Sequence, residues 1–208
     1  MVKKTIKRIL NEVFNLSQEE KVKLKDKFKL SFRHKRKGKE SDKFNQVLTY
    51  TFKSQKYKYI VDIEQYDLDF YLISFYPKLN LDFDIKQQKL EKMGMPSHTK
   101  YSYQTREKIP FQILNLLMGL MEDFLKENPM ASFGYFGAPN INTGNESEDF
   151  FNTKRLRIYD GMFKQNFSQT HEVITNPKFS GGLILNKKVL VNHPELKEYS
   201  FEILRSHV

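Results

Sequence analysis

The sequence contains no cysteine and no long apolar run among its 208 residues. The lack of cysteine excludes a disulfide framework, a thiolate metal site and a thiol nucleophile. The longest apolar stretch, residues 109–121, is shorter than the ~18–20 continuous apolar residues of a membrane span, and it includes polar residues. The first residues, MVKKTIKRIL, lack the apolar core of a signal peptide. We therefore expect a cytoplasmic protein without a membrane span.

Sequence signatures of common catalytic sites are missing as well. There is no Gly-x-Ser-x-Gly elbow and no Walker loop. The histidines show no metal-ligand spacing such as i, i+4, so no metal site is expected; they are His34, His98, His171, His193 and His207. Residues 82–86, Asp-Phe-Asp-Ile-Lys, match the tail of a metal-dependent nuclease pattern, for which Asp62 or Glu64 could supply the earlier acid. Solvent-exposed carboxylates are the simpler interpretation. These absences favour a non-enzymatic protein and leave an enzyme open.

Most of the chain also has little net charge, because the basic excess is confined to its first part. Residues 1–60 hold 18 of the 35 Lys and Arg residues and 6 of the 25 Asp and Glu residues. Their net charge is +12, against −2 for residues 61–208. An electrostatic field depends on where charges lie, so this asymmetry predicts a localised surface for an anionic partner.

The first piece of this basic region alternates between lysine and mainly apolar residues. Its lysines are Lys21, Lys23, Lys25, Lys27 and Lys29. Its apolar residues are Val22, Leu24, Phe28, Leu30 and Phe32. As a strand, the segment would place every lysine on one face; as a helix, it would spread them over more than half of the cylinder. The alternation favours a strand, whereas Ser17 and Glu20, a possible capping box, favour a helix.

A denser cluster of positive charge follows directly. It consists of Arg33, Lys35, Arg36, Lys37 and Lys39. Five like charges in seven residues repel one another unless an anionic partner screens them, so we expect a flexible, solvated segment. The two pieces together predict binding to RNA, DNA or a nucleic-acid-bound protein. Such a protein could be a regulator, or a phage- or mobile-element-encoded inhibitor of a bacterial defence system.

Hydrophobic periodicity predicts an α+β fold. Residues 3–15 have the spacing of an amphipathic helix, and residues 45–54, 57–65 and 68–76 have the composition of strands in an antiparallel meander. Residues 109–127 form the clearest helix, which packs against the meander as a long central helix and which Asn128-Pro129 should end.

Further elements are expected in the C-terminal part of the chain. We predict a buried strand over 131–138, a helix over 149–165, a strand near Leu183 and a terminal helix over 194–205, capped by His193. The organisation is then a basic N-terminal segment, residues 1–43, followed by a single α+β domain, residues 44–208.

The late helix carries a spacing that points to a known family. Asn152 is followed seven residues later by Tyr159 in Asn-Thr-Lys-Arg-Leu-Arg-Ile-Tyr. This spacing, together with the order of meander, helix, strand, helix and strand, resembles the acetyl-CoA-dependent N-acetyltransferase superfamily. The resemblance covers roughly residues 45–190.

The resemblance implies an alternative function, transfer of an acyl group from acetyl-CoA. Tyr159 would then act as the general acid toward the leaving thiolate, Asn152 would contact the cofactor, and Arg155 and Arg157 would meet its phosphates. The family binds the pyrophosphate on a glycine-rich loop at the start of the long helix. This chain has Gln-Thr-Arg-Glu-Lys-Ile-Pro-Phe at 104–111, without glycine. The fold would therefore be similar while the pyrophosphate-binding loop is missing.

Overall fold

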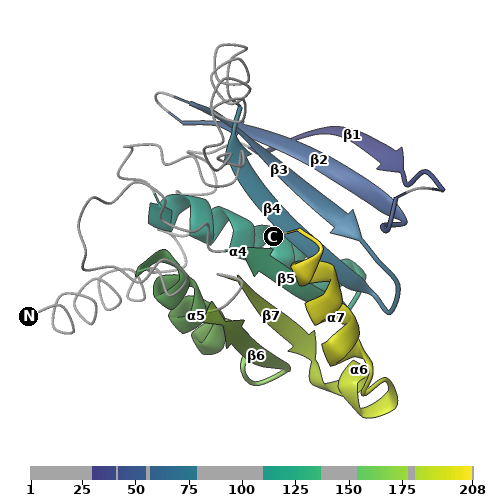
Figure 1. The fold of residues 1–208 in the computed structure, drawn as a ribbon. Helices are drawn as coiled ribbons and strands as arrows, with labels where there is room; N and C mark the ends of the chain where they lie inside the picture. The colour runs from purple at the N-terminus through teal and green to yellow at the C-terminus, as the bar shows by residue number, and fades with distance from the viewer. Residues whose placement is uncertain are drawn as a thin grey trace, which may run out of the picture.

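The computed structural model describes six parts of the chain: residues 30–40, 42–54, 57–78, 110–136, 154–177 and 181–207. Within these parts, seven strands form one mixed sheet with the order β1-β2-β3-β4-β5-β7-β6 (Figure 1). Four helices accompany the sheet in the same parts of the chain. The α+β class predicted from the sequence is therefore confirmed.

The first four strands form an antiparallel meander. They are β1 (Ser31–Lys37), β2 (Gln46–Lys53), β3 (Lys58–Gln65) and β4 (Phe70–Pro77). The last three agree with the predicted strands to within two residues. Strand β1 is hydrogen-bonded to β2 and so belongs to this sheet, although the sequence analysis placed it in the basic N-terminal segment.

The turn between β3 and β4 is longer than the sequence indicates. Leu68, which we predicted as the first residue of a strand, has a φ of 56°, and Asp69 has a φ of 54°. Non-glycine residues rarely adopt this left-handed region. The turn is closed by the Tyr66 amide, which donates to the Phe70 carbonyl at 2.8 Å. Two consecutive left-handed residues reverse the chain, so β4 starts only at Phe70.

The chain then crosses over to a parallel strand. Helix α4 (Pro110–Glu127) begins with a proline at its first position, as expected, and ends directly before Asn128. Strand β5 (Ser132–Phe136) follows and runs parallel to β4, from Phe70 opposite Ser132 to Ile73 opposite Tyr135. Helix α5 (Lys154–Phe167) comes next. The other neighbouring strands of the sheet pair in the antiparallel sense.

Two strands complete the sheet in the region where only one, near Leu183, was predicted. They are β6 (His171–Asn176) and β7 (Gly181–Asn186), and β7 lies between β5 and β6. The sequence carries no clear signal for β6 because its residues after the buried His171 are only half buried and alternate weakly in hydropathy.

Two helices follow β7, where one was predicted. Helix α6 (Lys187–Asn192) starts at the cap Asn186, whose side chain accepts a hydrogen bond from the Lys188 amide at 3.0 Å. The residue that we expected to cap the terminal helix, His193, instead caps the C-terminus of α6. Helix α7 (Leu196–Arg205) is the terminal helix.

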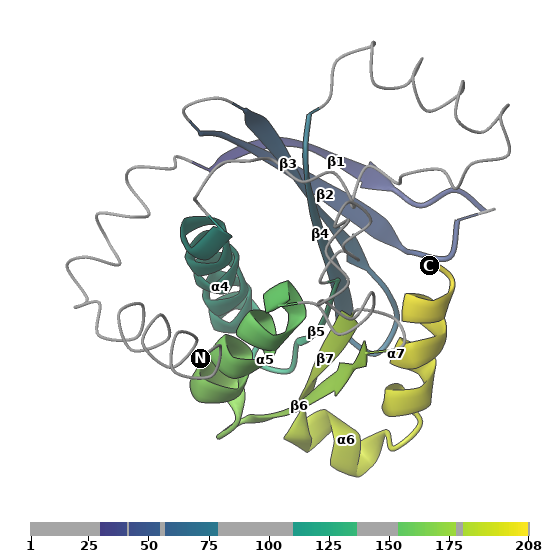
Figure 2. The same cartoon turned by 60° about the vertical axis from the view of Figure 1, so that its left-hand side comes forward.

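The sheet is the middle layer of three. Helices α4 and α5 lie on one of its faces, and α6 and α7 lie on the other (Figure 2). A first apolar cluster fills the space toward α4 and α5 and includes Val61, Leu114 and Leu156, which are all fully buried. A second cluster, including Leu72, Leu183 and Leu204, anchors α6 and α7. Among the described helices, none is long and apolar enough to cross a bilayer.

Candidate nucleic-acid interface

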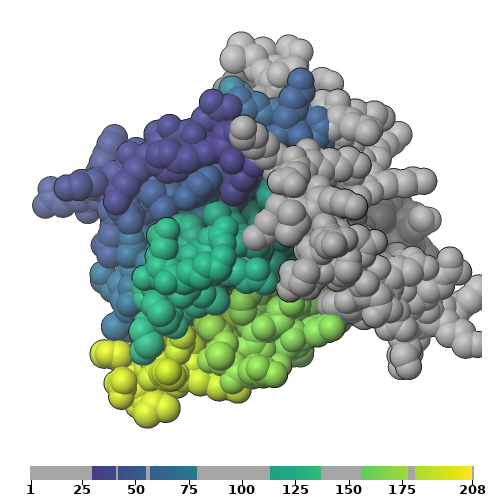
Figure 3. All heavy atoms as spheres, turned by 180° about the vertical axis from the view of Figure 1, so that it is seen from behind, coloured from purple at the N-terminus to yellow at the C-terminus, as the bar shows by residue number. Residues whose placement is uncertain are grey.

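Strand β1 is the exposed basic edge of the sheet. Apart from Ser31, every residue of the strand is exposed, and it pairs with β2 on one side. Figure 3 shows the purple atoms of β1 along the rim of the molecule, above the teal atoms of α4. We predicted a flexible segment for this basic cluster, and that prediction is wrong for Arg33–Lys37, which belong to a strand. Hydrogen bonds to β2 hold the backbone extended, while long side chains on an edge strand can still reach water.

A β-bulge at Arg33 decides which side chains share a face. Phe32 lies opposite Tyr50, but His34 lies opposite Thr49, so Arg33 is an extra residue in β1. A one-residue shift in the pairing register moves every later side chain of the strand to the other face of the sheet. Phe32 therefore points to the same face as Lys35 and Lys37, the face that carries α4 and α5. Without the bulge, Phe32 would share its face with His34 and Arg36.

The two arginines on the opposite face are engaged within the protein. The Arg33 Nε atom donates to Thr51 Oγ1 at 2.7 Å. The Arg36 guanidinium donates to Asp42 at 2.8 Å and lies 5.0 Å from the centre of the Phe44 ring, a cation–π contact. The Lys39 amide and Arg36 together hold the pKa of Asp42 below its usual value. These contacts stabilise the β1–β2 hairpin, so the arginines already have partners.

The lysines on the α4 face have no such partners. Lys35 and Lys37 make no hydrogen bond or ion pair with any residue that the structure describes, and both are exposed. Phe32 beside them has an exposed fraction of 55% and contacts the Tyr50 ring edge-on, with centroids 5.4 Å apart. The alternating pattern, taken as a strand, predicts Phe32 on the apolar face opposite the lysines at 21–29 and gives no sign that it joins Lys35 and Lys37. We call Phe32, Lys35 and Lys37 the β1 strip.

An acidic border limits the β1 strip on the side of α4. Burial raises the pKa of the Tyr50 hydroxyl, and the nearby Glu127 carboxylate at the end of α4 raises it further. Glu122 and Asp123 lie on the preceding turn of the same helix, where Asp123 is paired with Lys126 at 2.7 Å. These carboxylates make the end of α4 acidic near Tyr50, on the face of the sheet that carries the β1 strip.

The other basic residues of the predicted site are Lys39, which the structure describes, and the five lysines before β1, which it does not. Lys39 lies in the hairpin loop after β1, and its backbone amide donates to Asp42 at 2.9 Å. The alternating lysines, Lys21, Lys23, Lys25, Lys27 and Lys29, lie outside the described residues, so the choice between strand and helix stays open for them.

Tyr159, the residue that the acetyltransferase resemblance singles out, lies on α5 and faces the sheet. Its exposed fraction is 3%. Its ring packs against Phe75 of β4, Tyr135 of β5 and Phe163 of its own helix, with centroid distances of 6.2–6.4 Å. Tyr159 therefore lies beside the parallel pair β4–β5. Arg157 on the same helix is exposed, whereas Asn152 and the side chain of Arg155 lie outside the described part.

Tyr135 is a buried polar group next to Tyr159. Burial raises the pKa of its hydroxyl well above the usual value, so the phenol stays neutral. The hydroxyl makes no hydrogen bond of good geometry, although Thr175 is close enough to lower the pKa in part. Thr175 itself donates to Asp160, which also pairs with Lys164. The arrangement places two phenol rings side by side where β4 continues beyond the end of β5.

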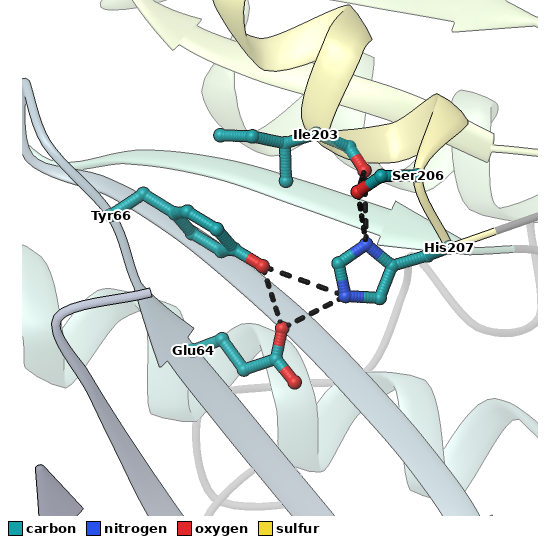
Figure 4. Close-up of polar contacts among 5 residues, drawn as sticks. All are labelled: Glu64, Tyr66, Ile203, Ser206 and His207. Atoms are coloured by element: carbon teal, nitrogen blue, oxygen red, sulfur yellow. Dashed lines mark hydrogen bonds and ion pairs between the residues drawn. The ribbon is translucent and has the colours of Figure 1, made fainter. Parts of the chain in front are cut away.

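A polar cluster that the sequence did not indicate joins the C-terminus to β3 (Figure 4). The Glu64 carboxylate accepts from the Tyr66 hydroxyl at 2.8 Å and lies 3.0 Å from Nε2 of His207. The other ring nitrogen, Nδ1, lies 2.9 Å from the Ile203 carbonyl oxygen. Both ring nitrogens face acceptors, and only a protonated imidazole donates from both. The hydrogen bond to Glu64 raises the pKa of His207. Residues 143 positions apart give no local sequence signal.

The remaining acidic and histidine residues do not assemble a metal site among the described residues. Asp62, an acid considered for the nuclease alternative, accepts hydrogen bonds from Thr49 and Tyr76 at 2.7 and 2.6 Å. The other residues of that alternative, at 82–86, lie outside the described part of the chain. The comparisons with protein-family models, curated proteins and solved structures found no match for this chain.

Proposed function

We propose that this protein binds nucleic acid, or the nucleic acid of a ribonucleoprotein, through the basic edge strand β1. The observation that carries the proposal is the β1 strip, in which two exposed lysines lack partners among the described residues. Cations without internal partners keep their full attraction for phosphates, since no ion pair has to be broken. The lysines at 21–29, which precede β1 directly, would extend this field.

Phosphate contacts of this kind have a measurable signature. Each lysine that meets a phosphate releases condensed counterions, so the logarithm of the binding constant falls linearly with the logarithm of the salt concentration. The near-neutral remainder of the chain, with a net charge of −2, contributes little to such a slope. The charge asymmetry therefore predicts binding that depends strongly on salt and weakly on base sequence.

Fluorescence anisotropy with labelled RNA and DNA tests the proposal. We expect saturable binding at about 50 mM salt that weakens steeply toward about 200 mM. The titrations should use single-stranded and duplex forms and a purified ribonucleoprotein. No binding to any of these ligands at low salt would contradict the proposal.

A second candidate function is acyl transfer from acetyl-CoA. It is favoured by the order of the described elements, a meander, a helix, a parallel strand, a helix and two late strands, with Tyr159 facing the β4–β5 pair. In that function Tyr159 would protonate the leaving thiolate, and Arg155 and Arg157 would contact the phosphates of the cofactor. The basic N-terminal part would then recruit an acidic acceptor.

Calorimetry with acetyl-CoA tests the second candidate independently of nucleic acid. We expect binding by the native protein, and we expect Tyr159→Phe to retain this binding while losing acyl transfer, because the variant lacks the hydroxyl group that would supply the proton. A native protein that binds no acetyl-CoA would exclude this function. Nucleic-acid binding would be unaffected by that result, since the β1 strip and Tyr159 lie at different places on the sheet.

A further inference from the structure

We propose that the β1 strip selects single-stranded nucleic acid, with a base stacked on Phe32 and neighbouring phosphates on Lys35 and Lys37. This inference rests on the proposed nucleic-acid binding and specifies its ligand. It draws on one aromatic ring and two cations that the bulge at Arg33 places on a common face.

Phe32 is unusual among the apolar side chains of the described structure. It and Val191 are the two large hydrophobic residues that are strongly exposed in the described parts of the chain. Val191 on α6 lies one turn after Lys187 and Lys188 but has no ring on which a base could stack, whereas Phe32 is aromatic and lies on the basic strand. Its contact with Tyr50 is edge-on, at an interplanar angle of 68°, and the ring stays 55% exposed. An exposed aromatic ring beside cations is the usual platform for an unpaired base.

The spacing of the two lysines suits an extended strand of nucleic acid. Lys35 and Lys37 are two residues apart on one face, which corresponds to about 6.8 Å at about 3.4 Å per residue. Successive phosphates of an extended single strand are separated by a similar distance. Phe32 lies on the same face of β1, three residues before Lys35. A single strand of nucleic acid could therefore place phosphates on the lysines and a base on the ring.

The surroundings of the β1 strip disfavour a duplex. A base inside a duplex is stacked on its neighbours and cannot offer its face to Phe32. No described helix projects from this edge to enter a groove, and the acidic end of α4, with Glu127 near Tyr50, borders the strip. A narrow single strand can follow β1 and avoid these carboxylates, whereas a wide duplex would bring a second backbone toward them.

Anisotropy titrations with a labelled oligothymidylate, an oligouridylate and a duplex of the same length test the inference. We expect the native protein to prefer the single strands. Phe32→Ala should weaken their binding by about fivefold or more, without changing the salt slope, because the ring carries no charge. Phe32→Tyr should restore the binding. Val191→Ala is the matched control, since it removes an exposed apolar side chain on α6 and should leave affinity unchanged.

The possible results distinguish this inference from the proposed function on which it rests. Equal affinity for duplex and single strands, or an unchanged affinity in Phe32→Ala, would overturn the inference while leaving nucleic-acid binding intact. A loss in Phe32→Ala that Phe32→Tyr does not restore would also overturn the stacking role. A native protein that binds none of the three probes would overturn the inference, and a further failure to bind a ribonucleoprotein at low salt would overturn the proposed function as well. Circular dichroism of each variant verifies the fold, which an exposed side chain should not affect.

Discussion

Strands β1 and β7 belong to the same sheet but are built in opposite ways. All six residues of β7 are buried, whereas six of the seven residues of β1 are exposed. Strand β7 lies between two other strands and between two helical layers, so packing determines its residues. Strand β1 needs little more than backbone pairing with β2. A strand whose charges are not required for folding is available for a ligand.

The charges themselves differ in the same way between the two regions. In the C-terminal region most described charges have internal partners: Glu172 with Lys197, Glu198 with Arg205, and Glu64 with His207. In β1 the arginines are engaged, but Lys35 and Lys37 are not. Counting basic residues would not distinguish the C-terminal region from β1. The two regions differ in whether their charged side chains have internal partners.

The largest effect on stability is expected at Gly182 in β7. A Cβ atom at this position would lie 2.5 Å from Cζ of Tyr135, whose ring is held in place by Phe163 at a centroid distance of 4.5 Å. We expect Gly182→Ala to lower the free energy of unfolding by about 1–3 kcal/mol because of this overpacking. Urea denaturation measures the loss. Lys35→Ala in β1 should change stability by less than about 0.5 kcal/mol.

A double variant provides the control for this explanation. If the clash with Tyr135 is the cause, Gly182→Ala should cost much less in a Tyr135→Ala background. An undiminished cost in that background would show that another contact is responsible.

The next largest effect concerns binding through β1. Reversing both free lysines, Lys35→Glu with Lys37→Glu, should weaken nucleic-acid binding about tenfold or more at low salt, because two attractions become repulsions. Lys188→Glu with Lys197→Glu makes the same change in net charge on α6 and α7, which lie on the other face of the sheet from α4 and α5 (Figure 2). Anisotropy compares the two. Equal losses would mean that overall charge, and not β1, controls binding.

A smaller effect is expected from the pH-dependent contact of His207. The pKa of His207 is raised in the folded protein, so its contribution to stability is complete below its unfolded pKa of about 6.5. The contribution is lost as the pH rises through the folded pKa. We expect His207→Gln to lower the free energy of unfolding by about 1 kcal/mol at pH 6 and by little at pH 9.

Urea denaturation of the native protein and of His207→Gln from pH 6 to pH 9 checks whether the difference in unfolding free energy shrinks as the pH rises. His171, whose pKa is lowered by burial, changes stability in the opposite direction, but it is present in both proteins and cancels. A difference that grows toward high pH would contradict the assignment of a protonated His207.

The smallest effect is expected for an exposed ion pair. Lys197 Nζ lies 3.0 Å from a Glu172 carboxylate oxygen, and both side chains are nearly half exposed. Lys197→Ala should therefore change the free energy of unfolding by less than about 0.5 kcal/mol, and less still at high salt. A loss above about 1 kcal/mol would show that this pair anchors α7 on β6.

Local patterns in the sequence were sufficient for the elements that lie in the core. Strands β2, β3 and β4 and helix α4 could be predicted because their apolar residues repeat with the period of their own structure. Strand β6 could not, since its half-buried residues carry a mixed pattern. Helix α6 is only six residues long, too short for a periodic signal.

The candidate site was predictable in its charge but not in its geometry. The basic residues of β1 are visible in the sequence, and their exposure follows from their chemistry. The bulge at Arg33 is not visible, yet it decides that Phe32 joins Lys35 and Lys37. The partners of Arg36 and His207 likewise depend on a hairpin and on a contact between distant segments. Pairing register and long-range contacts are properties of the folded chain.

The salt dependence of binding tests the central claim most directly. The native protein and a Lys35→Gln, Lys37→Gln variant should be titrated with the same single-stranded oligonucleotide over a series of salt concentrations. If both lysines contact phosphates, the slope of the variant should be shallower by about 1.4, at about 0.7 per contact. Identical slopes would contradict the claim that β1 carries the interface.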